Sequence, residues 1–154
     1  MKFDERPQLF VYDFDGVMTD NTAILNEEGI ESVVINRSDG LAVRYFYNLG
    51  IQQLILTTET SAVVNHRAKK LQIPIISGSE NKKEALTLYC QKNSIPLKNV
   101  LYIGNDLNDL EVMKCVGYPL CPSDAYPEIK AIAKWIIPVA GGKGVIRYLL
   151  EKFK

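Results

Sequence analysis

The sequence is poor in the residues that most often build metal and thiol sites. His66 is the only histidine among 154 residues, and the three cysteines, at positions 90, 115 and 121, are odd in number and lack the spacing of metal ligands. Zinc centres and catalytic cysteines need several such partners side by side, so neither is expected. We interpret the cysteines as buried or bystander thiols in a reducing cytoplasm.

An excess of charge of one sign is also missing. Lys and Arg number 18, Asp and Glu number 18, and the formal net charge at pH 7 is zero. Nucleic acids and anionic membranes attract strongly basic proteins, so neither is expected as a partner. An anionic small molecule would have to be bound locally, by a few positioned cations or by a metal ion.

Long hydrophobic runs are absent as well. No stretch approaches the roughly 20 apolar residues of a membrane span, and the charged first ten residues lack the apolar core of a signal peptide. With 47% hydrophobic residues, the chain can still fold around a core. We expect a single domain that spans residues 1–154.

Strand-like and helix-like segments alternate along the chain. This order predicts an α/β fold, a doubly wound parallel sheet with helices on both faces. Two short strand-like runs around Glu27–Gly29, within residues 23–36, predict a β-hairpin. The predicted strands are 9–14, 51–58, 74–77, 99–106, 118–122 and 134–139, and the predicted helices are 39–50, 61–73, 81–95, 107–117, 125–133 and 144–153.

Polar residues follow three of these strands. Asp13 and Asp15 come directly after the apolar run of residues 9–12. Thr57 lies near the end of the second predicted strand, and Asn105 and Asp106 end the fourth. In doubly wound sheets, ligands bind at the carboxyl ends of the strands. We therefore expect these side chains to meet at one edge of the sheet.

The two acids after the first strand predict a metal-assisted phosphoryl-transfer site. Two carboxylates this close repel each other unless a cation relieves the conflict. Asp13 and Asp15, with an oxygen from Asn105 or Asp106, form a hard-oxygen site that suits Mg²⁺. Asp13 could then attack phosphorus as a nucleophile. Asp15 could protonate the leaving alcohol and later deprotonate the attacking water.

Two further residues supply phosphate contacts in this interpretation. Thr57 can donate its hydroxyl to a phosphoryl oxygen, and Lys82 can bring positive charge to the transition state. The helix that contains Lys82 is expected to present Ala85, Leu88 and Tyr89 on one apolar side. The alternatives are an ordinary strand-end hydroxyl for Thr57 and a solvated helix charge for Lys82.

The motifs DFDGVMTD, LILTT, NKKEAL and GNDLND, in this order, resemble the haloacid dehalogenase superfamily of phosphotransferases. The resemblance covers essentially the whole chain. It is closest to a capless branch that comprises phosphatases of 3-deoxy-D-manno-octulosonate 8-phosphate and of nonulosonate (acylneuraminate-type) 9-phosphates, and a related domain of acylneuraminate cytidylyltransferases. It implies a Rossmann-like fold without a large cap domain, Mg²⁺ as the cofactor, and a sugar acid phosphate as the substrate.

The resemblance also implies individual roles. Asp13 matches the nucleophile, and Asp15 matches the acid/base, which also binds metal through its backbone carbonyl. Thr57 and Lys82 match the phosphate-binding pair. The third metal ligand of the family is usually an aspartate, and this chain has Asn105 there, followed by Asp106. Because an amide oxygen brings no charge, we expect weaker metal binding, with Asp106 as an alternative ligand.

Five more residues are candidates around this group. Asp109 is expected to orient ligands rather than to bind metal. Glu59 stands where the octulosonate enzymes have arginine, and together with Arg67 and Lys70 it looks like the nonulosonate relatives. Arg67 and Lys70 are candidates for binding a substrate carboxylate, or else plain surface cations. Lys143, in the GGKG segment, is either a residue that covers the site or part of an ordinary loop.

The predicted hairpin bears on assembly. The resemblance implies a homotetramer in which a hairpin of one subunit closes the site of its neighbour. The hairpin region carries more apolar side chains than a free flap should expose, and burial against another subunit would resolve this. These side chains are Ile24, Leu25, Val33, Val34 and Ile35.

Two rival classes of function stay open. Asn105 and Glu59 are compatible with a catalytically weak or inactive domain of the same fold, which sets the assembly of a cytidylyltransferase or another partner. Such a domain would form tetramers without turnover. A receiver domain of the response-regulator type also uses strand-end acids and a lysine, but its acids would not form a DxDG motif after the first strand.

Overall fold

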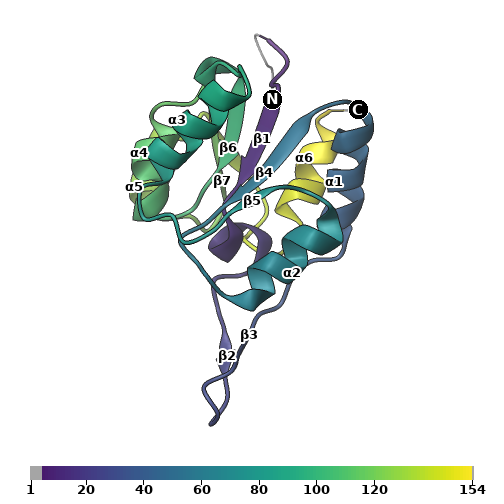
Figure 1. Cartoon of the computed structure of the whole chain (residues 1–154), viewed down its shortest axis with the longest axis vertical. Coiled ribbons are helices and arrows are strands. Elements are labelled where there is room, and N and C mark those ends of the chain that lie inside the picture. Colours follow the sequence, from purple (N-terminus) through teal and green to yellow (C-terminus); the bar gives the residue numbers. More distant parts are fainter. Residues whose placement is uncertain (1–4, 154) are drawn as a thin grey trace.

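The computed structural model describes residues 5–153 and contains one six-stranded sheet (Figure 1). All of its strands are parallel, in the order β5–β4–β1–β6–β7–β8. The predicted doubly wound sheet is confirmed. Its strands are β1 (Leu9–Tyr12), β4 (Gln52–Leu56), β5 (Ile75–Ile76), β6 (Val100–Ile103), β7 (Tyr118–Pro122) and β8 (Trp135–Ile137).

Helices cover both faces of this sheet (Figure 1). One face carries α1 (Ser38–Asn48), α2 (Ala62–Leu71) and α6 (Val145–Glu151), and the other carries α3 (Lys82–Lys92), α4 (Leu110–Met113) and α5 (Pro127–Ile132). Short helical turns are η1 (Phe14–Met18), η2 (Leu97–Asn99) and η3 (Leu107–Asp109). Within residues 5–153, every helix falls short of the length and hydropathy that a membrane span needs.

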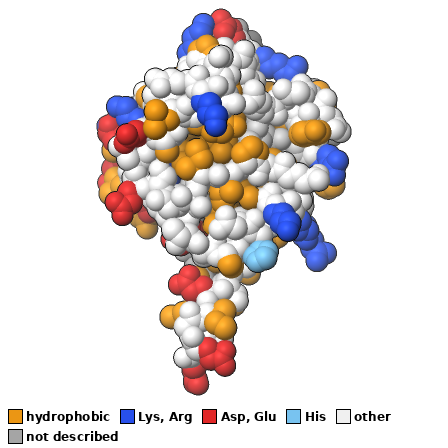
Figure 2. All heavy atoms as spheres, viewed as in Figure 1, with side chains coloured by type: hydrophobic (Ala, Val, Ile, Leu, Met, Phe, Trp, Pro, Cys, Tyr) orange, Lys and Arg blue, Asp and Glu red, His pale blue; other side chains and the backbone are white. Residues whose placement is uncertain are grey.

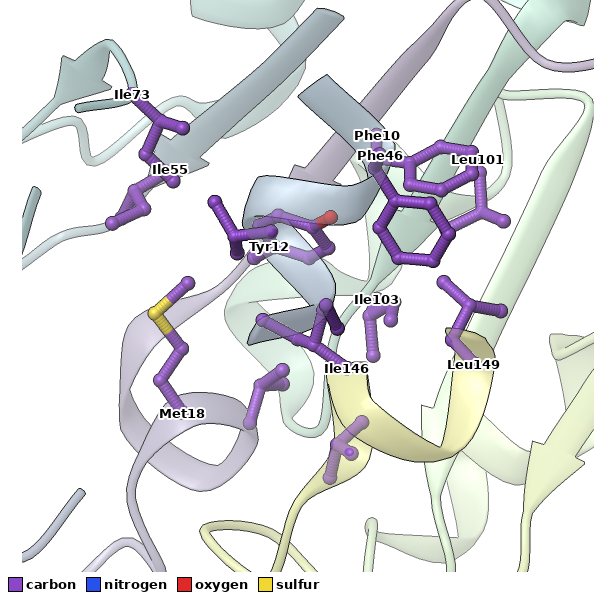
Figure 3. Packing of buried hydrophobic residues seen from close by; sticks show 14 of the residues in the cluster. Phe10, Tyr12, Met18, Phe46, Ile55, Ile73, Leu101, Ile103, Ile146 and Leu149 are labelled. Carbon is purple, nitrogen blue, oxygen red and sulfur yellow. The ribbon is translucent and has the colours of Figure 1, made fainter. Parts of the chain in front are cut away.

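The alternation of side chains along β1 explains the two layers. Phe10 and Tyr12 point to the α1, α2 and α6 side, and Leu9 and Val11 point to the α3, α4 and α5 side, all with 0% exposure. Figure 3 shows Phe10 and Tyr12 near Phe46 within the first of these cores. A strand buried on both faces must be apolar throughout, so β1 is a continuous run of large side chains.

The order of the strands places β1 at the centre of the sheet. From β1 the chain proceeds to β4 and β5 on one side and then crosses back to β6 on the other side. At such a switch point, the connections that leave adjacent strands run in opposite directions and open a crevice. Asp13 directly follows β1 and therefore lies at this crevice.

The predicted hairpin is also confirmed. Strands β2 (Ile24–Leu25) and β3 (Glu31–Ser32) pair antiparallel and project from the body of the molecule (Figure 1). Apolar side chains lie on the projecting part, next to acidic side chains at its tip (Figure 2). Ile24, Leu25 and Ile30 are 57–68% exposed. Val33 and Ile35, by contrast, pack against the core.

Candidate active site

Polar side chains from the carboxyl ends of the central strands surround a cavity of about 150 Å³. We call it the acidic cavity. The structure brings Asp13, Thr57 and Asn105 together here from β1, β4 and β6, as their places at the strand ends predict. The full lining consists of Asp13, Asp15, Asn21, Thr57, Thr58, Glu59, Asn105, Asp106 and Asn108.

The turn after β1 depends on Gly16. Its φ is +81°, in the left-handed region that glycine adopts most easily. A Cβ atom at this position would also overlap the Asn105 side chain. Gly16 therefore allows the Asn105 amide to approach the turn that contains Asp13 and Asp15. The Gly16 amide donates to Thr19 Oγ1 over 3.3 Å, and that hydroxyl donates to Asp15 Oδ1 over 2.9 Å.

A buried chain of charges lies behind the cavity. Lys82 Nζ is 2.8 Å from Asp13 Oδ1 and 2.7 Å from Asp109 Oδ1. The Phe14 amide also donates to Asp13 Oδ1, over 2.8 Å. Asp109 is 0% exposed and Lys82 is 1% exposed. Such an arrangement is held in place by its own bonds, since an unpaired charge at this depth would be costly.

Burial shifts the pKa values of Asp13, Lys82 and Asp15, together with the charges around them. The pKa of Asp13 is raised well above its usual range by burial and by the charge of Asp109, while Lys82 opposes the shift. Burial alone would lower the pKa of Lys82, but Asp13 and Asp109 outweigh it, so the net direction is upward. Burial also raises the pKa of Asp15, against its hydrogen bond from Thr19. One ammonium thus faces two carboxylates, which leaves a demand for further positive charge.

The prediction for the face of α3 was right for Ala85 and Tyr89, which pack against the core, and wrong for Leu88. The buried side chains of α3 are Lys82, Leu86 and Cys90, whereas Leu88 is 58% exposed. The sequence pattern counts a lysine as a surface residue. Here its charge is matched by Asp13 and Asp109, so Lys82 lies on the core side and Leu86 and Cys90 follow it at helical spacing.

Asn105 provides a test of whether a cation fits. One end of its amide lies 2.9 Å from the Asp15 carbonyl oxygen and 3.2 Å from Asp13 Oδ2. With nitrogen at that end, the amide donates to both oxygens. With oxygen there, three oxygens converge, an arrangement that only a hard cation such as Mg²⁺ would stabilise. Among the described residues no group of three His, Cys, Asp or Glu side chains could hold a metal, so such a site would depend on the amide and the carbonyl.

Asp106 and Asp109 support the loop that carries Asn105. Asp106 lines the cavity, and its carboxylate accepts from the Leu107 amide over 2.7 Å at the start of η3. Asp109 Oδ2 accepts from the backbone amide of Asn105 over 2.8 Å and from the backbone amide of Asp106 over 3.4 Å. Asp109 thereby connects the loop after β6 to Lys82.

Arg67 and Lys70 do not line the acidic cavity. They lie on α2 and line a second cavity of about 410 Å³, together with Arg37 and Arg44. We call this the basic cavity. Arg67 is 8% exposed and donates from Nη2 to the Asn36 carbonyl over 3.1 Å. Within one chain, the residues proposed to bind a substrate carboxylate are therefore separate from those proposed to act on phosphate.

Glu59 and Lys143 take different positions. Glu59 lines the acidic cavity, and its amide donates to Thr57 Oγ1 over 3.1 Å. Lys143 is not among the lining residues, and its Nζ lies 3.8 Å from Asp20 Oδ2. The glycines before Lys143 pack against the backbone of the turn that follows β1, and the Gly142 amide donates to the Val17 carbonyl. This loop therefore supports that turn from outside the cavity.

Three residues that line the acidic cavity, Asn21, Thr58 and Asn108, were not predicted, and neither were two residues that bond to its acids. Thr19 bonds to Asp15 and lies within the DFDGVMTD motif, so its position near the acids was a usable signal. Tyr102 donates to Asp109 Oδ1 over 2.7 Å. It stands in the apolar strand β6, where nothing local distinguishes it from a core residue.

Comparison with known proteins gives a family for these residues. The family model described as haloacid dehalogenase-like hydrolase matches residues 10–149, a range that contains the whole lining of the acidic cavity. The 3-deoxy-D-manno-octulosonate 8-phosphate phosphatase KdsC of Escherichia coli (strain K12) is 32% identical over 148 residues. The match covers 96% of this chain and 79% of that protein.

Solved structures of similar proteins have the same fold. One is 3-deoxy-D-manno-octulosonate 8-phosphate phosphatase from Moraxella catarrhalis in complex with a magnesium ion, a phosphate ion and a KDO molecule. It matches with a TM-score of 0.91 and 34% identity over 95% of this chain and 84% of that chain. The phosphatase of the same name from Yersinia pestis has a TM-score of 0.90 and 29% identity, over 94% and 79%.

Proposed function

The chain belongs to the haloacid dehalogenase-like hydrolases and is a phosphatase of that family, and we propose that it hydrolyses the phosphate monoester of an eight- or nine-carbon keto-deoxy sugar acid. One observation carries the proposal. Asp13 opens to the acidic cavity at the end of the central strand while Lys82 and the Phe14 amide hold its Oδ1. A carboxylate fixed in this way is suited to attack phosphorus.

The proposed reaction has two steps. First, a carboxylate oxygen of Asp13 attacks phosphorus, the bond between phosphorus and the sugar oxygen breaks, and Asp15 gives its proton to that oxygen. Second, Asp15 takes a proton from water as the water oxygen attacks phosphorus. The bond between phosphorus and Asp13 then breaks and inorganic phosphate leaves. Burial raises the pKa of Asp15, which is the direction that a proton donor needs.

We propose Mg²⁺ as the cofactor. The Asp13 carboxylate, the Asp15 carbonyl and the Asn105 amide oxygen would hold the ion, with Asp106 as a further oxygen donor at the cavity wall. When bound, the ion supplies positive charge that stabilises the phosphoryl oxygens. Thr57 would contact the same phosphoryl group from the end of β4, and Lys82, at the start of α3, would add positive charge from behind Asp13. The Moraxella relative, which contains magnesium and phosphate, supports this assignment.

The size of the sugar acid depends on the cavity wall. The relatives from E. coli and Moraxella are named for the 8-phosphate of 3-deoxy-D-manno-octulosonate. Glu59, which lines the acidic cavity beside Thr57, instead favours a nonulosonate 9-phosphate on the resemblance described above. Lys70 and Arg67 would bind the carboxylate of the substrate, and the basic cavity in which they lie would have to come from a neighbouring subunit.

The assembly we propose is a cytoplasmic homotetramer of this single-domain chain. The projecting hairpin exposes Ile24, Leu25 and Ile30, side chains that gain from burial against a second copy. Light scattering at micromolar concentration should give about four times the mass of the chain. A monomer that has full activity with sugar acid phosphates would contradict this assembly.

A substrate screen tests the function itself. Purified protein with Mg²⁺ is assayed for phosphate release from octulosonate 8-phosphate, a nonulosonate 9-phosphate, and neutral sugar phosphates of similar length. We expect the highest kcat/KM for one of the two sugar acids, and loss of activity when the metal is chelated. A folded tetramer that releases no phosphate from any of them would favour the inactive assembly domain instead.

A further inference from the structure

Tyr102 lies fully buried behind the proposed catalytic group. Its hydroxyl donates a 2.7 Å hydrogen bond to Asp109 Oδ1, the same oxygen that lies 2.7 Å from Lys82 Nζ. Lys82 Nζ is in turn 2.8 Å from Asp13 Oδ1. Tyr102 is therefore connected through Asp109 and Lys82 to Asp13, the carboxylate proposed to react. Tyr102 itself lines no part of the acidic cavity.

We propose that Tyr102 is a positioning residue that sets how Lys82 is shared between Asp109 and Asp13; this inference rests on the proposed function. Asp109 Oδ2 already accepts from the backbone amides of Asn105 and Asp106. Its Oδ1 has two donors, the Tyr102 hydroxyl and the Lys82 ammonium. A carboxylate oxygen that accepts from two donors attracts each of them less strongly than it would attract one.

The consequence of this sharing falls on Lys82. Without the hydroxyl, Asp109 Oδ1 would keep the ammonium as its side-chain donor and draw it away from Asp13. The ammonium would then be less well placed for the charge that develops on the phosphoryl group during transfer. An interaction that counts mainly in the transition state affects kcat more than KM.

Tyr12 provides a matched control. It lies on β1, next to β6 in the sheet, and is also 0% exposed. Its hydroxyl donates over 2.9 Å to Gln53 Oε1, and the side chain belongs to the core on the opposite face. Tyr12→Phe removes a buried hydroxyl of the same kind, with a similar cost in stability, but leaves the donors of Asp109 unchanged.

The kinetic experiment compares Tyr102→Phe with Tyr12→Phe in the metal-loaded enzyme. We expect Tyr102→Phe to lower kcat about tenfold, with KM changed by less than about twofold, because a hydrogen bond to a charged group is lost. Tyr12→Phe should leave both constants within about twofold of the parent. An unchanged kcat in Tyr102→Phe, or an equal loss in Tyr12→Phe, would overturn the inference.

A second measurement does not need turnover. The side-chain ammonium resonance of Lys82, assigned by its loss in Lys82→Arg, reports the bonding of Nζ. It should shift in Tyr102→Phe and stay in place in Tyr12→Phe. If the parent releases no phosphate from any substrate, the proposed function fails, and this resonance alone decides the inference. A Lys82 signal that is the same in both variants and the parent would refute the positioning role.

Discussion

The acidic and basic cavities differ in how their charges are satisfied. In the acidic cavity, Asp13 has Lys82 and the Phe14 amide as partners, and Asp109 behind it accepts from four donors. Arg67 lines the basic cavity and Asp39 precedes Gly40 of its lining; Arg67 Nε and Asp39 Oδ2 are buried without a hydrogen-bond partner among the described residues. The charged groups at the acidic cavity are thus held by hydrogen bonds and ion pairs within the protein. Asp39 and Arg67 each keep one buried polar atom without a hydrogen-bond partner among the described residues.

This difference indicates a division of tasks. The acidic cavity holds the parts that phosphoryl transfer needs except for positive charge, which a metal ion would add. The basic cavity has four cationic side chains and, in its lining as described, no acidic ones. A sugar acid phosphate carries anionic groups at both ends. One chain keeps the two kinds of recognition apart, and an assembly of chains would bring them together.

The largest effect on activity is expected when the proposed nucleophile of the acidic cavity is replaced. Asp13→Asn should lower kcat on the order of 10³-fold or more, because an amide is a poor nucleophile. The variant should remain folded, since the amide is nearly the same size as the carboxyl group. Phosphate release under saturating substrate measures the loss. Near-normal turnover in a variant confirmed by mass spectrometry would exclude the covalent mechanism.

The next effect concerns the pH dependence of stability that the buried carboxylate of Asp39 causes. Asp39 is 1% exposed and lies at the start of α1, where its Oδ1 accepts from the Arg147 amide over 2.8 Å. Burial raises its pKa from 3.8 to about 6, against the opposing effects of the Arg147 amide and Arg67. The folded protein therefore holds a proton on Asp39 over a pH range in which the unfolded chain has already released it.

The sign of the pH dependence follows from that shift. The stability that protonated Asp39 contributes is complete below about pH 4 and is lost as the pH rises through about 6. Relative to Asp39→Asn, the parent should thus lose about 2 kcal/mol of unfolding free energy between pH 4 and pH 7. Urea unfolding across this range measures it, with Glu28→Gln at the exposed hairpin tip as the control. A difference that does not vary with pH would show that Asp39 is not strained by burial.

The strand ends could be predicted from sequence, and the buried face of α3 only in part. Apolar runs and turn residues indicate where each strand stops, and parallel strands bring those ends together. This was enough to place Asp13, Thr57 and Asn105 at one cavity. Which side of α3 is buried depends on Lys82 meeting two carboxylates from distant segments. No local pattern contains that information.

The same limit applies to residues that depend on more than one element. Tyr102 reads as one more apolar strand residue because its partner, Asp109, lies beyond the end of β6. Arg67 and Lys70 were placed correctly on a helix, but their distance from the acidic cavity follows from how α2 packs beside α1. Side-chain placement of this kind is decided by tertiary packing.

A smaller effect sharpens the division between the cavities. Lys70→Met removes one exposed cation of the basic cavity, and Lys69→Met removes an exposed cation that does not line it. We expect Lys70→Met to raise KM for a sugar acid phosphate about tenfold, since a charged hydrogen bond to the carboxylate is lost. KM for a small phosphate monoester whose alcohol part carries no carboxylate should not change. Equal effects of both substitutions, or none, would remove Lys70 from the substrate site.

The smallest effect concerns the one uncharged side chain among the proposed metal ligands. Asn105→Asp adds a negative charge where the amide lies 2.9 Å from the Asp15 carbonyl and 3.2 Å from Asp13 Oδ2. Without metal this charge faces other oxygens and should lower stability. With metal it becomes a ligand charge, so Mg²⁺ affinity should rise on the order of fivefold.

Asn108→Asp separates a ligand effect from a general one. Asn108 also lines the acidic cavity, so this variant adds the same charge to the cavity wall but not where the oxygens converge. Calorimetric titration with Mg²⁺ should show tighter binding in Asn105→Asp than in Asn108→Asp, together with a larger metal-induced rise in melting temperature. If both variants bind Mg²⁺ equally well, the gain comes from net charge alone. Asn105 would then not be a metal ligand.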